Sequence, residues 1–415
     1  MKTPYTTIAA AVLLLHTALA EAETDSQDQP SLTFDGYGTL GIVHSDEDQA
    51  DFTSDLLDPD GAGASRDWSP EVDSRLALQA SADLSDRVTA IVQLVAEQRY
   101  DDSYEPTVEW ANIRYQATPG LTLRAGRMVL PAFMTSEYRK VGYALPTVRP
   151  APEVYRIVPI SNVDGVSASY RSRFDGVTNT LQGVYGRKTS KFPGGQVGDV
   201  DAERGITLAN TLEWGATTLF ASYNHTHLTF EGFNPFFDAF RQFGPAGAAI
   251  ADRYDVDNKE FEFFTLGARY DPGEWFVLGE ATTSDSRTFI GEARAWYVTG
   301  GVRIGAFTPY ASFARAGTGS ATSDPGLDTA GLPPAAAGPA SQLNGALNML
   351  LNTAARQTRT ALGIRWDFAR SASLKMQYDR IDLGNNSTGT LVNPQPGFRP
   401  GGSVNLFSLA LDFVF

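Results

Sequence analysis

The sequence predicts an all-β fold, a transmembrane antiparallel β-barrel, and three observations lead to this prediction. Apolar and polar residues alternate through almost the whole chain after a short N-terminal leader. The candidate strands number sixteen, and their connections are sorted into short turns and long loops. The last strand ends on an aromatic residue, Phe415. A membrane barrel shows a period of two because one face of each strand contacts lipid and the other faces the interior.

The N-terminus has the pattern of a secretory signal peptide. Lys2 supplies a positive charge, Ile8–Ala20 is apolar, and Ala20 and Ala22 offer a small-residue cleavage pattern. The alternative is an uncleaved anchor, but the apolar run is shorter than the roughly 20 residues that a spanning helix needs. We therefore expect residues 1–22 to be removed, residues 23–30 to form a polar stretch, and residues 31–415 to form the barrel.

Composition excludes several classes of function. The chain has 415 residues, with 48 acidic and 33 basic side chains and a formal charge of −15. A nucleic-acid-binding protein would show a basic surplus instead. The sequence contains no cysteine, which rules out a disulfide scaffold, a thiolate metal site and a cysteine nucleophile.

Alternation defines the strands but does not by itself require a membrane. In residues 88–99, Val92 and Leu94 fall on one face, while Gln93 and Glu97 fall on the other. A soluble sandwich would bury the apolar face against a second sheet, whereas a barrel would turn it towards lipid. The candidate strands cover residues 31–45, 73–82, 88–99, 108–117, 121–130, 163–171, 179–188, 205–213, 217–228, 260–270, 275–284, 293–304, 308–315, 358–369, 373–382 and 403–415.

Connection lengths favour the barrel over the sandwich. Short connections include 83–87, 118–120, 214–216 and 305–307, whereas 46–72, 131–162, 229–259 and 316–357 are long. The short and long connections alternate, so they fall at opposite rims, as they do in outer-membrane barrels with short periplasmic turns and long extracellular loops. A sandwich has no reason to sort its loops in this way. The final strand, SVNLFSLALDFVF, is apolar on one face up to Phe415, which resembles the C-terminal signal of bacterial outer-membrane barrels.

The third long loop, Pro131–Asn162, carries five prolines and follows the fifth strand. Its flanks, LRAGRMVLP and VDGVSASY, together with the strand count, the loop order and Phe415, resemble the Gram-negative general porins. The Pro-Glu-Phe-Gly-Gly run of enteric porins is absent, and VRPAPEVY stands in its place. The resemblance implies an outer-membrane channel for small hydrophilic solutes, narrowed by a third loop folded into the lumen, with no catalysis. It also implies a homotrimer that contacts membrane lipid and lipopolysaccharide, and recognition of Phe415 by the barrel-assembly machinery.

Charged residues on the loop and on the polar face of the strands predict a constriction. Proline lowers the entropy that a loop loses when it is ordered inside a lumen. Opposed charges across a narrow wet gap disfavour apolar solutes and admit ions and polar molecules. The net charge favours cations on balance, although a basic wall would act in the opposite direction. The predicted loop residues are Glu137, Arg139, Arg149 and Glu153, and the predicted basic wall consists of Arg75, Arg99, Arg114 and Arg124.

Three other features suggest alternatives. His225 and His227 share one side of a strand, which suits a metal site or the base of an outer-membrane hydrolase, but Ser222 falls on the opposite face. A pair at the polar membrane interface is the simpler interpretation, and we expect no metal. Gly36–Gly41 matches a dinucleotide-binding pattern without the helix that must follow it, so no cofactor is expected. Residues 341–356 predict a short amphipathic helix over the mouth or against a neighbouring subunit. A substrate-selective channel and a surface adhesin remain alternative functions.

Overall fold

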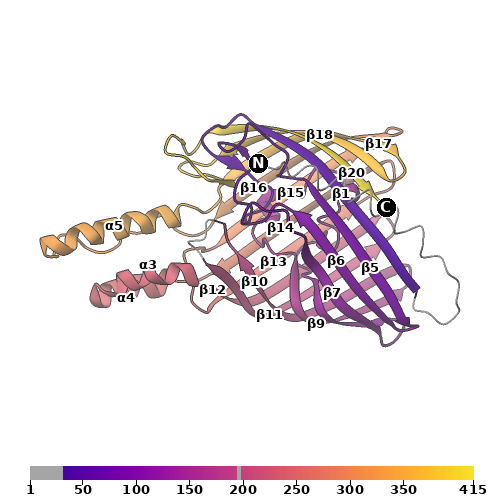
Figure 1. Cartoon of the computed structure of the whole chain (residues 1–415), viewed down its shortest axis with the longest axis horizontal. Coiled ribbons are helices and arrows are strands. Elements are labelled where there is room, and N and C mark those ends of the chain that lie inside the picture. Colours follow the sequence, from indigo (N-terminus) through magenta and orange to yellow (C-terminus); the bar gives the residue numbers. More distant parts are fainter. Residues whose placement is uncertain (1–30, 194–197) are drawn as a thin grey trace.

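The computed structural model describes residues 31–193 and 198–415, so the predicted signal peptide and polar stretch lie outside the described residues. Sixteen long strands form one closed antiparallel barrel, which confirms the predicted fold class (Figure 1). Successive strands are neighbours, and β1 closes the barrel by pairing with β5 and β20. The barrel strands are β1 (Ser31–Ser45), β5 (Arg75–Ser85), β6 (Val88–Glu97), β7 (Thr107–Gln116), β8 (Leu121–Val129), β9 (Asn162–Phe174), β10 (Val177–Lys191), β11 (Asp199–Trp214), β12 (Thr217–Phe230), β13 (Lys259–Tyr270), β14 (Trp275–Ser286), β15 (Ala293–Val302), β16 (Phe307–Thr318), β17 (Gln357–Ala369), β18 (Ala372–Leu383) and β20 (Ser403–Val414).

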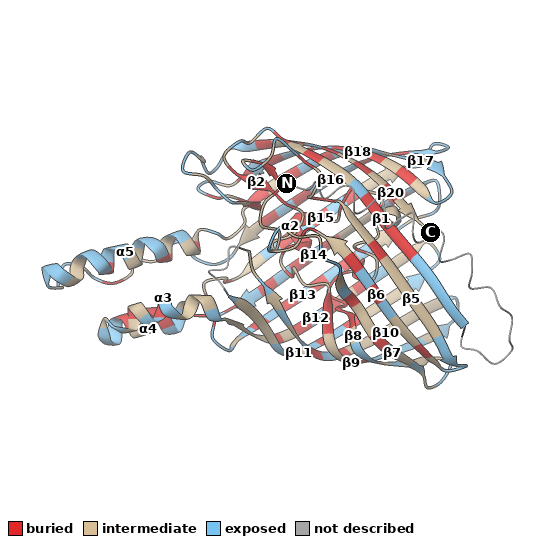
Figure 2. Cartoon of the chain, viewed as in Figure 1, coloured by how far each residue is buried: buried red, intermediate tan, exposed pale blue. Residues whose placement is uncertain are grey.

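The two faces of the wall differ as the alternation predicts. Leu94 is 39% exposed on the outside, whereas its neighbour Val95 is fully buried inside. Figure 2 shows buried and exposed residues alternating along the strands. Outward aromatic residues gather towards both rims, as in membrane barrels, where they lie at the level of the lipid headgroups. Those near the short turns include Tyr170, Trp214, Trp275, Trp366 and Phe415, and those nearer the long loops include Trp68, Tyr185, Trp296 and Tyr378.

The long loops carry the remaining elements. Short strands β2 (Asp51–Phe52), β3 (Ala62–Gly63) and β19 (Leu391–Val392) form a small sheet between the first and last long loops, while β4 (Trp68–Ser69) pairs with β1. Residues 231–254 contain η3 (Glu231–Phe233), α3 (Asn234–Arg241) and α4 (Gly244–Tyr254). Among the described residues, no helix is both long and apolar enough to cross a membrane.

Helix α5 (Pro334–Leu351) overlaps the predicted helix over 341–356, but it begins and ends several residues earlier. Pro334 occupies the first helical position, where its fixed φ favours a helix start. The helix extends away from the barrel beside the α3–α4 hairpin and does not lie across the mouth (Figure 1). Phe237 and Phe240 of α3 share an apolar cluster with Leu347 and Leu351 of α5, so the two projections support each other.

Four glycines lie side by side on neighbouring strands of the wall. Gly126 pairs with Gly165, Gly165 with Gly186, and Gly186 with Gly205, across β8 to β11. Gly126 has a φ of +121°, a conformation that other residues avoid. A Cβ atom at Gly165 would lie 2.0 Å from the carbonyl oxygen of Tyr185. The backbones of neighbouring strands therefore approach closely at this row, where glycine leaves room for them.

Candidate pore constriction

The loop between β8 and β9 folds into the barrel and is packed against its inner wall. We call residues 130–161 the inner loop; it contains η2 (Gly142–Ala144) and α2 (Pro152–Tyr155). Ser222 of β12 donates to the carbonyl oxygen of Ala132 at 2.7 Å, on one side of the lumen. Lys375 of β18 donates to the carbonyl oxygens of Gly142 and Thr147 at 2.6 and 2.9 Å, on the other side. Within residues 131–161, only Glu137 and Ala144 are exposed.

One set of contacts is a buried network of alternating charges, which we call the arginine network. Arg149 of the inner loop binds both carboxylate oxygens of Asp73, at 2.8 and 2.5 Å. Arg359 of β17 donates to Asp379 of β18 at 2.8 Å and to Glu153 of α2 at 3.1 and 3.2 Å. All five side chains are at most 6% exposed. The network joins the inner loop to the first long loop and to two strands.

In this network each buried charge lies close to a charge of opposite sign. Arg149 also lies 3.8 Å from Asp379, which links its two halves. Burial alone would lower the pKa of the Arg149 guanidinium, but the adjacent Asp73 carboxylate raises it above its usual range. Buried charges are stable only when paired and hydrogen-bonded in this way.

A second cluster lies against β6 and β7. The Lys140 ammonium group of the inner loop donates to Glu97 at 2.5 Å and to Glu109 at 2.9 Å. Burial lowers the pKa of Lys140, but the Glu109 and Glu97 carboxylates outweigh this and raise it overall. Asn162 donates to the same Glu109 at 3.1 Å and accepts a hydrogen bond from Lys188. On this side of the barrel the loop is therefore cationic and the wall is acidic.

A third cluster surrounds Glu280 of β14. Its carboxylate accepts hydrogen bonds from Tyr155 at 2.5 Å, from Tyr297 at 2.8 Å and from the Met134 backbone at 2.7 Å. Burial raises the pKa of Tyr155 well above its usual value, and the Glu280 charge raises it further. Tyr155 therefore stays a hydrogen-bond donor and fixes α2 to this wall.

Two polar cavities adjoin the inner loop from opposite ends of the barrel. The cavity at the short-turn end has a volume of about 290 Å³ and includes Arg269, Arg303 and Arg365 among its lining residues. The cavity at the long-loop end has a volume of about 390 Å³ and is lined partly by Glu97 and Lys140. Arg149, Pro150 and Tyr155 line both cavities, so these residues lie between the two.

The four predicted loop residues have different surroundings. Glu137 is exposed. The Arg139 guanidinium donates to the carbonyl oxygen of Pro159 at 3.1 Å and lies 3.8 Å from the Asp55 carboxylate. Arg149 and Glu153 belong to the arginine network. Buried partners therefore offset the charges of Arg149 and Glu153, whereas Glu137 is the acidic inner-loop residue that faces water.

The four predicted wall arginines do not form one row. Arg75 lies at the start of β5 with its guanidinium 3.7 Å from Glu97, and Arg99 follows β6 and pairs with Glu105 at 3.1 Å. Both are near the long-loop end.

The other two arginines lie near the short-turn end of the lumen. Arg114 and Arg124 face each other in the register of β7 and β8. Arg114 donates to Thr89 at 3.1 Å. Neither arginine forms an ion pair with any residue that the structure describes.

Sequence reasoning missed the partners that hold the loop, namely Asp73, Glu280, Arg359, Lys375 and Asp379. The strand residues among them occupy inward positions of the period-two pattern, which is the signal that identifies them as lumen residues. Glu153 and Arg359 are separated by 206 positions, however, and no local pattern pairs them.

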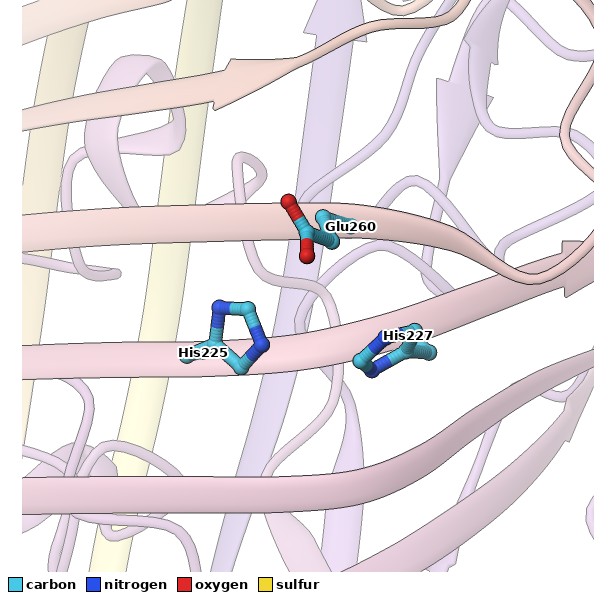
Figure 3. Close-up of side chains that lie close together, drawn as sticks. All are labelled: His225, His227 and Glu260. Carbon is cyan, nitrogen blue, oxygen red and sulfur yellow. The ribbon is translucent and has the colours of Figure 1, made fainter.

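The histidine pair lies on the outer face of the barrel, towards the long-loop rim. The ligand atoms of His225, His227 and Glu260 lie within 4.8 Å of one another (Figure 3). The Nδ1 atom of His225 is 3.1 Å from the carboxylate of Glu262. Ser222 faces the lumen, where it is bonded to Ala132, so it supplies no nucleophile beside His225.

Comparisons with known proteins agree with this architecture. A family model described as Gram-negative porin matches residues 8–395. Among solved structures, an anion-selective porin from Comamonas acidovorans is similar, with 13% identity, a TM-score of 0.54, and coverage of 93% of this chain and 100% of that one. OmpF of Salmonella typhi, in complex with daunomycin, has 12% identity, a TM-score of 0.54, and coverage of 94% and 99%.

The outer-membrane channel DcaP of Acinetobacter baumannii has 10% identity, a TM-score of 0.52, and coverage of 94% and 99%. At these identities the likeness shows the fold alone. No curated protein sequence matches the chain. The family match, in contrast, spans most of the sequence and accords with a closed sixteen-stranded barrel. The chain therefore belongs to the Gram-negative porin family and is a diffusion channel of the outer membrane.

Proposed function

We propose that the protein is a passive, non-catalytic channel for small hydrophilic solutes and ions, and that the inner loop is its constriction. The observation that carries the proposal is the position of Arg149, Pro150 and Tyr155 between two polar cavities. Solutes would pass the inner loop at these residues. The arginine network and the Glu280 cluster would keep the gap at a fixed width, because they attach the loop to several strands.

We propose that the channel prefers anions, which differs from the preference expected from net charge. Five arginines and one aspartate line the short-turn cavity, and three of these arginines lie outside the arginine network, in which carboxylates pair with Arg149 and Arg359. Eight basic and five acidic residues line the long-loop cavity. Charges beyond about 10 Å are largely screened at 0.1 M salt. The lining, and not the charge of −15 on the whole chain, would therefore set the selectivity.

We also propose a homotrimer in contact with outer-membrane lipid and lipopolysaccharide, with Phe415 read by the barrel-assembly machinery. One of the similar structures is described as a trimer form of OmpT of Vibrio cholerae. The Phe415 backbone pairs with Gly36 at 2.8 and 3.0 Å, so the C-terminus is part of the closing seam. Deleting Phe415 is expected to lower the yield of assembled barrel in cells, while chemically refolded protein still conducts.

Planar-bilayer recording of the refolded mature chain under a KCl gradient tests the function and the ion preference. We expect open-channel current steps and a reversal potential whose sign shows that chloride is more permeant than potassium. If ions pass about 7 Å from the Glu137 carboxylate in water-like surroundings, removing its charge lowers the energy of a chloride ion and raises that of a potassium ion by about 0.6 kcal/mol each. Glu137→Gln is therefore expected to raise the chloride-to-potassium permeability ratio about sevenfold, because the energies of the two ions change with opposite signs. Glu231→Gln, in the loop that carries α3, is the matched control and should leave the ratio unchanged. An unaltered ratio in Glu137→Gln would remove this residue from the constriction.

Two alternative functions have distinct readouts. A channel selective for one solute would show saturable current that this solute blocks. An outer-membrane hydrolase would lose ester-hydrolysing activity in His225→Ala. We expect neither activity nor conductance to change in that variant, because Ser222, the serine nearest to His225 in the sequence, faces the lumen.

A further inference from the structure

A third cavity lies beside the inner loop at the long-loop end and differs in chemistry from the other two. Its volume is about 550 Å³. It is bounded by the end of the inner loop, by the long-loop ends of β10 to β16, by the loop between β14 and β15, and by the last two long loops. Apolar side chains form most of its wall, among them Val163, Leu228, Phe230, Phe261, Phe289 and Ile290.

Apolar side chains that face the lumen are unexpected in a channel that passes only hydrophilic solutes. Phe261 is 7% exposed and points inward from β13, whereas its neighbour Glu262 points outward. The usual alternation is thus inverted here, with an apolar residue towards the lumen. Apolar side chains around an open space of 300–1,000 Å³, with a few oriented polar groups, are characteristic of sites for small organic molecules.

Three of the cationic residues of this cavity lack carboxylate partners. Arg156, Arg187 and Lys188 line it, and among the described residues none of the three forms an ion pair within 4 Å. Arg156 is 8% exposed and uses one guanidinium nitrogen to donate to the carbonyl and hydroxyl oxygens of Thr53. The Lys188 ammonium group donates to the neutral Asn162 side chain at 2.5 Å.

The acidic residues that share the cavity are already engaged. Glu153 is bound by Arg359, and Glu292 is paired with Arg294. Burial lowers the pKa of Arg156, and the more distant Asp55 and Asp58 only partly offset this. Burial also raises the pKa of Asp58 well above its usual value, which weakens its charge as a partner for Arg156. A buried guanidinium without an ion pair is costly, and an incoming anion would relieve that cost.

We propose that this cavity binds an organic anion that has an apolar aromatic or aliphatic body, with its carboxylate on Arg156 and Lys188. The body would contact Phe261, Phe289 and Ile290, and the solute would then pass to the neighbouring polar cavity. Leu57, Pro159, Ile160, Lys188 and Ser190 line both of these cavities. Passage of the solute through the barrel rests on the proposed channel function. Binding of the solute in this cavity is tested separately.

The test is equilibrium dialysis of radiolabelled 4-phenylbutyrate with the refolded full chain held in an amphipathic polymer. Butyrate has the charge without the ring, and 4-phenylbutan-1-ol has the ring without the charge. We expect each to bind about tenfold or more weakly than 4-phenylbutyrate, since the ring buries apolar area and the carboxylate gains charged hydrogen bonds.

Variants separate the two contributions. Arg156→Met should weaken 4-phenylbutyrate binding about tenfold while leaving 4-phenylbutan-1-ol binding unchanged, and Ile290→Asn should weaken both. Lys188→Met repeats the charge test if Arg156→Met does not refold, and Arg380→Met, an exposed arginine on β18, is the matched control. Equal binding of all three probes, or equal binding by wild type and charge variants, would overturn the proposal.

The same preparation is recorded in a bilayer with KCl alone. Conductance steps without selective binding of 4-phenylbutyrate would reject this site and leave the channel function standing. Selective binding without conductance would support this site and reject the channel function.

Discussion

Replacing Arg359 by Met is expected to release the inner loop from the barrel wall and to raise single-channel conductance. Arg359 contributes the cation nearest to both Glu153 and Asp379, at 3.1 and 2.8 Å. Removing one partner of a buried ion pair typically costs about 3–5 kcal/mol, because a charge is left without compensation. The strand ladder does not depend on this contact, so the cost should appear as local opening of the loop and not as unfolding of the barrel.

Two measurements detect that opening. Recordings of Arg359→Met should show larger and noisier current steps than wild type, and a protease added to the refolded protein should cut within residues 130–161. Adding Glu153→Gln and Asp379→Asn to this variant should recover much of the loss, because hydrogen bonds remain possible while the unpaired buried charges disappear.

Arg380→Met is the matched control for the stability effect. Arg380 pairs with Asp382 at 3.1 Å, but both side chains are about half exposed. Such pairs contribute less than about 1 kcal/mol. If Arg359→Met behaves like this control, with unchanged conductance and protease resistance, the arginine network does not hold the inner loop.

The strands were predictable because their signal is local. Each predicted range overlaps one barrel strand, and the inward position of Lys375 and Asp379 follows from the outward position of Met376 and Tyr378. The sorted connections then determine which rim each loop occupies. The alternation of apolar and polar residues therefore predicts most of the barrel, including which charged residues face the lumen.

The contacts of the inner loop were less predictable because they connect distant parts of the chain. Alternation identifies Arg359 as a lumen residue but cannot indicate that it meets Glu153 and not free solute. Five prolines in the third long loop mark a segment of low flexibility, without showing which wall it contacts. The expected preference for cations came from the total charge, whereas the proposed preference for anions comes from the basic surplus that lines the cavities beside the loop.

The row of glycines across β8 to β11 is a further feature that amino-acid composition does not predict. Glycine within a strand weakens it unless backbones must approach closely. In this barrel the four positions are far apart in sequence and adjacent in register. Gly186 and Gly205 also line the apolar cavity, so the glycine row helps to shape the proposed binding site.

Gly165→Ala is expected to reduce the stability of the barrel by about 1–3 kcal/mol, the usual range for overpacking. The new Cβ atom would lie 2.0 Å from the Tyr185 carbonyl oxygen and 2.6 Å from the Gly186 Cα atom. Both contacts are with backbone held in the ladder of β9 and β10, so neither can move without breaking strand pairing. The measurement is urea-induced unfolding of the protein refolded in lipid vesicles, followed by tryptophan fluorescence.

Gly183→Ala supplies the matched control, since Gly183 lies on β10, three residues before Gly186. A Cβ there would meet only the Leu208 side chain, at 3.6 Å, which is ordinary van der Waals contact. Alanine also restricts the unfolded chain more than glycine does, so the control should be neutral or slightly stabilising. Only a defect in Gly165→Ala that Gly183→Ala lacks can be assigned to the close approach of strands. Equal unfolding midpoints for the two variants would mean that the wall relaxes around the added atom, and that the close approach of the strands does not require glycine.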